Sequence, residues 1–113
     1  MISYSFGDVI LVSFPFTDQT SAKKRPAVVV SSNVYNQEHP DLIVMAITSQ
    51  RYIASMVSDV IVTYWSEAGL LKPSVIKGIM ATVEKGLVLR QLGRLQDIDK
   101  EALQNALQTI LGE

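Results

Sequence analysis

Short apolar runs rich in β-branched residues occupy the first two-thirds of the chain, and polar residues, glycines or prolines separate them. This alternation is typical of an antiparallel sheet. The predicted strands are Asp8–Phe14, Ala27–Ser32, Leu42–Ile47, Asp59–Tyr64, Ser74–Thr82 and Gly86–Leu89. Because no amphipathic helix of about a dozen residues separates them, the pattern predicts a small barrel or sandwich rather than βαβ units.

The last segment of the chain has the period of a helix. One apolar face is formed by Leu103, Ala106, Leu107, Ile110 and Leu111. Asp97 and Asp99 are expected to supply the N-cap and a favourable first-turn charge, with Ile98 packing onto Leu103 and Gly112 ending the helix. We expect this helix to pack on the barrel or on a second subunit.

Length and composition narrow the class of protein. The chain has 113 residues, of which 48% are hydrophobic and 19% charged. These values predict one globular domain, residues 1–113, with a core of its own. The absence of Cys excludes disulfides, Cys-ligated zinc and a thiol nucleophile, and His39, the single His, excludes a two-His metal site. Without a membrane-length apolar run or a signal peptide, we expect a cytoplasmic protein with no membrane partner.

The formal net charge of -1 hides an asymmetry along the chain. Residues 1–94 carry nine basic and seven acidic side chains, whereas residues 95–113 carry one basic and four acidic side chains. A mildly basic body therefore precedes an acidic C-terminal segment. This distribution keeps a nucleic-acid partner open, although the average charge alone argues against one.

A basic cluster, Lys23-Lys24-Arg25, ends the polar loop that follows the first predicted strand. Arg25 precedes Pro26, and a residue before proline favours extended backbone, so Arg25 is expected to have restricted freedom where the loop meets the sheet. Its planar guanidinium suits a bidentate contact with phosphate. The alternative is a solvated basic loop without a function.

A second polar cluster, Thr48-Ser49-Gln50-Arg51, follows the third predicted strand. Hydroxyls at such a position often only cap a turn, which is the alternative interpretation. His39 lies in the polar segment Ser32–Asp41 and is expected to be exposed rather than catalytic.

Signatures of metal sites, Walker A loops, nucleophile elbows and dinucleotide-binding loops are all absent from the sequence. Among enzymes, the remaining chemistry is one that needs only Arg, Thr, Ser and Lys. Ribonuclease transesterification qualifies, because the RNA 2′-hydroxyl supplies the nucleophile and the protein aligns it and stabilises the charge of the phosphorane.

Several motifs, in this order and spacing, resemble the MazF/PemK/Kid family of toxin endoribonucleases. They are Gly7–Val12, Lys24–Val30, Ala46–Ser49, Ser74–Lys77 and Leu92–Leu95, with Phe14–Asp18 similar to the PemK-like branch. Each motif is weak alone, but together they span nearly the whole chain.

The resemblance implies a fold, an activity and partners. The fold is mainly β with α: a small SH3-like antiparallel β-barrel of the CcdB/Kid/MazF type with a C-terminal helix. The implied activity is sequence-selective cleavage of single-stranded RNA without metal or other cofactor, leaving a 2′,3′-cyclic phosphate and a 5′-hydroxyl. The family also implies a homodimer and a cognate antitoxin, whose acidic tail would lie over the basic RNA-binding groove.

Residue by residue, the resemblance makes Arg25 and Thr48 the catalytic pair. Arg25 would stabilise the phosphorane, and the Thr48 hydroxyl would hydrogen-bond the scissile phosphate. The RNA-binding candidates are Lys23, Lys24, Ser49, Gln50 and Lys77. The chain departs from the Kid-like branch in the fifth strand, where Lys77 and Ile79 stand in place of Arg and Asp. Since Ile79 cannot exchange a proton, cleavage is expected to depend mainly on Arg25 and Thr48.

Two other functions are compatible with the same fold class. A CcdB-like toxin would poison a topoisomerase through the C-terminal helix, and gyrase-dependent DNA breaks without RNA fragmentation would identify it. A non-catalytic SH3-like nucleic-acid or peptide binder would bind RNA without turnover. Its usual aromatic platform has few candidates here, such as Tyr64 and Trp65.

Overall fold

The computed structural model describes residues 3–14, 23–49 and 58–112, and the elements follow the order expected of a mainly β chain with a C-terminal helix. The strands and helices are β1 (Asp8–Phe14), β2 (Lys23–Val29), α1 (Asn33–Glu38), β3 (Asp41–Ser49), β4 (Val60–Val62), β5 (Ser74–Glu84), the 3-10 turn η1 (Lys85–Leu87), β6 (Val88–Arg94) and α2 (Asp97–Leu111).

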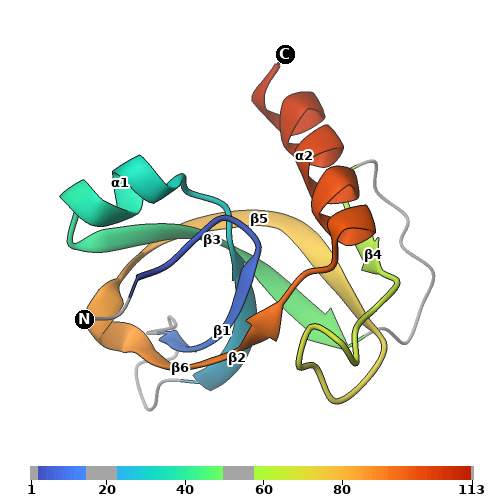
Figure 1. The fold of residues 1–113 in the computed structure, drawn as a ribbon, viewed down its shortest axis with the longest axis horizontal. Helices are drawn as coiled ribbons and strands as arrows, with labels where there is room; N and C mark the ends of the chain where they lie inside the picture. The colour runs from blue at the N-terminus through green and yellow to red at the C-terminus, as the bar shows by residue number, and fades with distance from the viewer. Residues whose placement is uncertain (1–2, 15–22, 50–57, 113) are drawn as a thin grey trace.

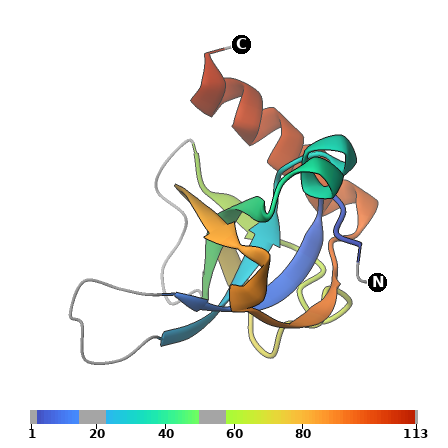
Figure 2. The same cartoon turned by 90° about the vertical axis from the view of Figure 1, so that its left-hand side faces the viewer.

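The described strands form one antiparallel sheet in the order β4-β5-β3-β2-β1-β6. The sheet curls so strongly that its ribbon closes most of a ring, with α1 at one end and α2 across the outside (Figure 1). Figure 2, turned by 90°, shows α2 extending away from the curled sheet. The predicted mainly β, barrel-like architecture with a C-terminal helix is confirmed.

Both faces of the sheet are buried, each in its own apolar cluster. In β2, Val28 belongs to one cluster and Val29 to the other, as expected because successive side chains of a strand point to opposite faces. The first cluster includes Leu103 and Ala106 of α2, so the helix packs on the outside of the sheet. Packing on the barrel was one of the two predicted placements of this helix. The second cluster, with Leu42 and Val83, fills the inside of the curl.

A buried carboxylate, Asp99, joins α2 to the segment after β4. Its Oδ1 accepts a hydrogen bond of 3.0 Å from the Thr63 backbone N–H, and its Oδ2 accepts one of 2.9 Å from that of Tyr64. The prediction that an aspartate supplies the N-cap is wrong, because Gln96 is the N-cap residue and makes no side-chain hydrogen bond there. The predicted first-turn charge is confirmed, since Asp97 and Asp99 both lie in the first turn of α2. The predicted end at Gly112 is confirmed by its left-handed backbone, φ 80°.

The apolar stripe of α2 is only partly buried. Leu103 and Ala106 lie in the core and Leu107 and Ile110 pack against it, whereas Leu111 is exposed. Ile98 is also exposed, which argues against the predicted contact with Leu103.

Several predicted boundaries differ from the structure, and one short helix was not predicted. The second strand begins four residues earlier than predicted, at Lys23, because Lys23–Arg25 pairs with β1 despite its polar side chains. The polar segment after this strand contains the short helix α1, whose N-cap Ser32 accepts a hydrogen bond of 3.2 Å from the Tyr35 N–H. The last strand starts after a 3-10 turn and continues to Arg94, whereas the prediction ended it at Leu89.

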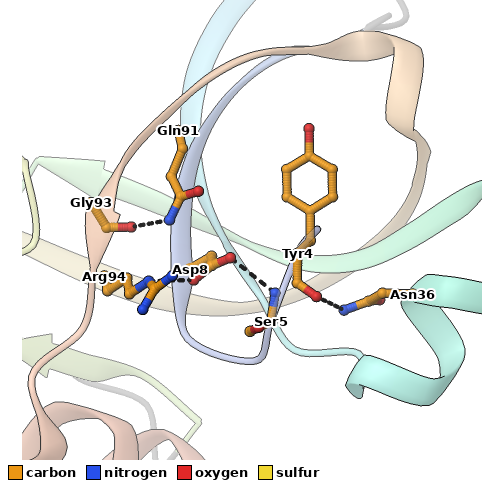
Figure 3. A network of polar contacts seen from close by, with 7 residues as sticks. All are labelled: Tyr4, Ser5, Asp8, Asn36, Gln91, Gly93 and Arg94. Atoms are coloured by element: carbon orange, nitrogen blue, oxygen red, sulfur yellow. Dashed lines mark hydrogen bonds and ion pairs between the residues drawn. The ribbon is translucent and has the colours of Figure 1, made fainter. Parts of the chain in front are cut away.

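Polar contacts hold the N-terminal segment against the sheet (Figure 3). The buried Asp8 carboxylate accepts a 2.9 Å hydrogen bond from the Ser5 N–H through Oδ2, and its Oδ1 lies 3.3 Å from Arg94 Nε. The buried Asn36 amide donates to the Tyr4 carbonyl oxygen at 3.0 Å. Burial, and to a lesser degree the Asp8 charge, raise the pKa of Tyr4.

Candidate functional site

A hollow of about 640 Å³ lies where the ends of β2 and β3 meet β1, β6 and the segment before β5. We call it the central hollow. Its described lining residues are Leu11, Lys24, Arg25, Pro26, Ile47, Thr48, Ser49, Gly69, Leu70, Leu71, Lys72, Ser74, Arg90 and Leu92. Apolar side chains supply much of its surface, and polar groups from several separate segments surround them, as is common in ligand sites.

Both predicted catalytic residues line the central hollow. Strands β2 and β3 pair from Val29 and Val44 as far as Ala27 and Ala46, and Arg25 and Thr48 each lie two residues beyond that last pair. Arg25 also pairs with Val12 of β1. The guanidinium and the hydroxyl therefore come from adjacent strands at the end of the sheet where both strands terminate.

The opposite wall of the central hollow depends on two glycines. Gly69 has φ 86°, and a Cβ built on it would lie 2.0 Å from the Leu92 carbonyl oxygen. Likewise, a Cβ on Gly93 would lie 2.4 Å from the Ala68 carbonyl oxygen. Only residues without a side chain allow the two backbones to approach this closely. This contact sets the segment Gly69–Lys72 beside β6, where both line the hollow.

The charge of the described lining has one sign. Four of its residues, Lys24, Arg25, Lys72 and Arg90, are cationic, and none is Asp or Glu. All four are exposed. Clustered cations without carboxylates attract polyanions even when the chain as a whole is slightly acidic, because the local field decides the encounter. With the Thr48 and Ser49 hydroxyls, the lining can bind phosphate oxygens.

The structure brings together four of the predicted site residues and separates one. Lys24, Arg25, Thr48 and Ser49 all line the central hollow. Lys77 does not line it, and its Nζ instead forms an ion pair of 2.9 Å with Asp59 Oδ2. The side chain of Lys23, together with Gln50 and Arg51, falls outside the described part of the chain.

Two further residues of the sequence analysis lie away from the hollow. Ile79, at the position of the family's Asp, is exposed on β5 and does not line it. His39 is exposed at the end of α1, as predicted, and its ring stacks on Tyr35 with 4.0 Å between centroids.

The sequence analysis missed Lys72 and Arg90. Arg90 lies in β6, where it pairs with Leu11 of β1, and Leu11 in turn pairs with Pro26 of β2. This row across three strands brings Arg90 to the hollow. The residues of β6 do not alternate between polar and apolar, so no local signal in the sequence marks Arg90 as a residue of the hollow.

Residues 3–14, 23–49 and 58–112 contain no group of three or more His, Cys, Asp or Glu side chains placed to hold a metal ion. Neither described helix has the length and apolar character needed to cross a bilayer.

The decisive comparison is with protein families. Residues 5–111 match the model of the PemK-like, MazF-like toxin of type II toxin-antitoxin systems. The chain belongs to this toxin family. A search of curated protein sequences found no match.

Solved structures of toxins share the fold. An endoribonuclease from a mycobacterial species, solved with its cognate antitoxin, has a TM-score of 0.79 and 20% identity over 97% of this chain and 96% of that one. The Mycobacterium tuberculosis toxin MazF-mt6 gives 0.74 and 22%, covering 93% of this chain and 96% of that one. MazF of Deinococcus radiodurans in a MazE-MazF structure gives 0.77 and 19%, covering 98% of each. At these identities the likeness establishes the fold, a curled antiparallel sheet with a C-terminal helix.

Proposed function

We propose that this toxin-family chain is an endoribonuclease that cleaves single-stranded RNA by attack of the substrate's own 2′-hydroxyl. The 2′-oxygen would bond to phosphorus as the bond from phosphorus to the 5′-oxygen breaks, with the 2′-hydroxyl proton passing to water and the leaving 5′-oxygen taking a proton from water. The products would be a 2′,3′-cyclic phosphate and a 5′-hydroxyl. The observation that carries the proposal is the position of Arg25 and Thr48 in one basic hollow. Endoribonuclease and MazF toxins among the structures of the same fold support it.

The roles of the two residues follow from their chemistry. As the 2′-oxygen attacks phosphorus, negative charge accumulates on the non-bridging oxygens, and the planar Arg25 guanidinium can stabilise it with two parallel hydrogen bonds. Because an arginine side chain has a pKa above about 12, charge stabilisation suits it better than proton donation. The Thr48 hydroxyl donates to the same phosphate and fixes its orientation relative to the attacking oxygen.

The mechanism requires no metal from the protein. The described lining of the central hollow offers cations and hydroxyls, with no carboxylate or imidazole that would serve as metal ligands. Charge compensation by Arg25, and alignment of the 2′-hydroxyl with the leaving 5′-oxygen, provide the acceleration instead.

Substitution of Arg25 tests the proposal. In Arg25→Ala, we expect RNA cleavage by the purified protein to fall at least about 100-fold, the loss typical of removing a transition-state donor. The fold should survive because Arg25 is exposed, and its thermal melting curve provides that control. A folded Arg25→Ala protein that cleaves as fast as the parent would overturn the proposal.

We further propose a homodimer neutralised by an antitoxin with an acidic segment, for which the four cations of the hollow provide complementary charge. Toxins of the same fold have been solved with their antitoxins. An Asp- and Glu-rich peptide from the neighbouring reading frame should inhibit cleavage competitively with RNA, whereas noncompetitive inhibition would contradict binding in the hollow. Light scattering tests the dimer.

A further inference from the structure

Three basic residues outside the central hollow have partners within the fold. Lys77 pairs with Asp59 at 2.9 Å, and Arg94 Nε lies 3.3 Å from Asp8 Oδ1. The Lys85 ammonium donates to a backbone carbonyl oxygen of α1. These cations contribute to the structure of the chain and are partly neutralised there.

Lys72 and Arg90 differ from them. Within the described part of the chain, neither side chain takes part in an ion pair or a hydrogen bond, and both are exposed at the rim of the hollow. Both join Lys24 and Arg25 in a lining whose described residues include no Asp or Glu, so an anion bound there meets several cations without a competing carboxylate.

The distance across the sheet separates this wall from the catalytic pair. Arg90 lies on β6 and Thr48 on β3, and β1 and β2 lie between them. Three strand spacings amount to roughly 14 Å along the sheet, and the two spacings between Arg90 and Arg25 on β2 to roughly 10 Å. Because the sheet curls, these lengths are upper bounds, and a phosphate bound between Arg25 and Thr48 leaves the Arg90 guanidinium able to bind a neighbouring phosphate of the same strand.

Apolar side chains lie on the same wall. Leu70 and Leu92 contribute to the lining, and Leu71, at 92% exposed, projects into solvent next to Lys72. A nucleobase has a flat apolar face that gains from such contacts, whereas an acidic peptide gains mainly from the charges. The combination of cations and exposed leucine favours a nucleotide.

We propose that Lys72 and Arg90 bind a phosphate adjacent to the cleaved one, and that the leucines beside them receive the base of that neighbouring nucleotide. The inference rests on the proposed function, because it assigns the cleaved phosphate to Arg25 and Thr48. Lys72 and Arg90 are positioning residues: they hold the strand in register and contribute to binding rather than to the bond-breaking step.

The test measures binding and cleavage separately in Lys72→Gln, Arg90→Gln and the control Lys100→Gln. Lys100 is a partly buried lysine of α2 that does not line the hollow, so its substitution removes the same charge elsewhere. The binding probe is a short single-stranded RNA with 2′-O-methyl groups throughout, which removes the attacking hydroxyls. Cleavage of unmodified RNA is followed in a single turnover at saturating protein.

We expect each hollow variant to bind the probe about 3- to 10-fold more weakly and to lower the slope of log affinity against log salt by about 0.7, the value for one phosphate contact on a single strand. The saturated cleavage rate should change less than about twofold, since KM rather than kcat reports a binding contact. The control should match the parent in both measurements. A second version of the probe carries a neutral methylphosphonate in place of one phosphate that flanks the cleavage position. At the position that Arg90 contacts, this replacement should weaken binding by the parent, and Arg90→Gln should then weaken binding no further.

Three results would overturn the inference. One is unchanged probe binding by both hollow variants. Another is a saturated rate that falls about 100-fold with affinity intact, which would place the residues at the reacting phosphate. The third is weaker binding of an acidic poly-Glu peptide without weaker RNA binding, which would make this wall a protein-docking surface.

The two proposals fail differently. A parent protein that cleaves RNA while its variants bind normally refutes only the role of Lys72 and Arg90. A parent that never cleaves RNA, but binds the probe in a manner that depends on Arg90 and Lys72, refutes the nuclease and leaves the binding site.

Discussion

At the scale of single residues, position in the sheet gives ordinary side chains their proposed chemistry. Thr48 is a partly buried hydroxyl near the end of β3, and Arg25 is an exposed cation in β2, where it pairs with Val12. Neither is unusual alone. Their chemistry depends on adjacent strands that end at the same hollow, beside further cations that concentrate a polyanion there.

The role of Thr48 can be separated from its shape. Thr48→Val keeps the branched side chain and removes the hydroxyl, so it should lose a hydrogen bond to a charged phosphate, worth about 1.5–3 kcal/mol. We expect single-turnover cleavage to slow by roughly 10- to 100-fold. Thr48→Ser restores the hydroxyl and should stay within about threefold of the parent. Equal rates for the Val and Ser variants would exclude the proposed hydrogen bond.

At the scale of elements, the segment Gly69–Lys72 and strand β6 form one wall of the site through a backbone contact. Gly69 and Gly112 both have positive φ, 86° and 80°, but only Gly69 has backbone within 4 Å of a built Cβ. The two glycines therefore share the same kind of backbone conformation and differ in whether a side chain would collide with neighbouring backbone.

Alanine at these two glycines should have unequal costs. Gly112→Ala should lower the free energy of unfolding by at most about 1–2 kcal/mol, the cost of a left-handed residue with a side chain. Gly69→Ala should lower it by about 2–5 kcal/mol, because overpacking against the Leu92 carbonyl adds to that cost. Urea denaturation of both variants measures the difference. Similar losses in the two variants would contradict the close approach of the two backbones.

Local sequence patterns predicted the elements better than their ends. Strand β1 was predicted with its observed bounds, because an apolar run between turn residues marks it on both sides. The start of β2 was missed because Lys23–Arg25 is polar and its strand pairing comes from β1 rather than from its own composition. Helix α1 was missed because its six residues carry no apolar stripe.

The site shows the same limit. Arg25 and Thr48 were proposed from a family resemblance, and both line the central hollow. Lys72 and Arg90 could not be found in this way, because their position depends on how the sheet curls and on the contact between Gly69 and Leu92. Both features join segments distant in the chain, which local periodicity does not encode.

At the scale of the whole molecule, charge is divided between two regions. The net charge is -1, and four of the 11 acidic residues lie beyond residue 94, in or next to α2. The cations of the central hollow come instead from β2, β6 and the segment before β5. This division gives a slightly acidic protein a local excess of positive charge, which is where the proposed RNA substrate would bind and which the average charge does not reveal.

The central claim is that this chain cleaves RNA with its own side chains and the substrate's 2′-hydroxyl. The most direct measurement is incubation of the purified protein with a long single-stranded RNA in excess EDTA, followed by identification of the ends formed. We predict fragments with 5′-hydroxyl and 2′,3′-cyclic phosphate ends, at a rate that EDTA does not change and that Arg25→Ala abolishes. Intact RNA in EDTA with cleavage restored by a divalent metal, or fragments with 5′-phosphate ends, would contradict it.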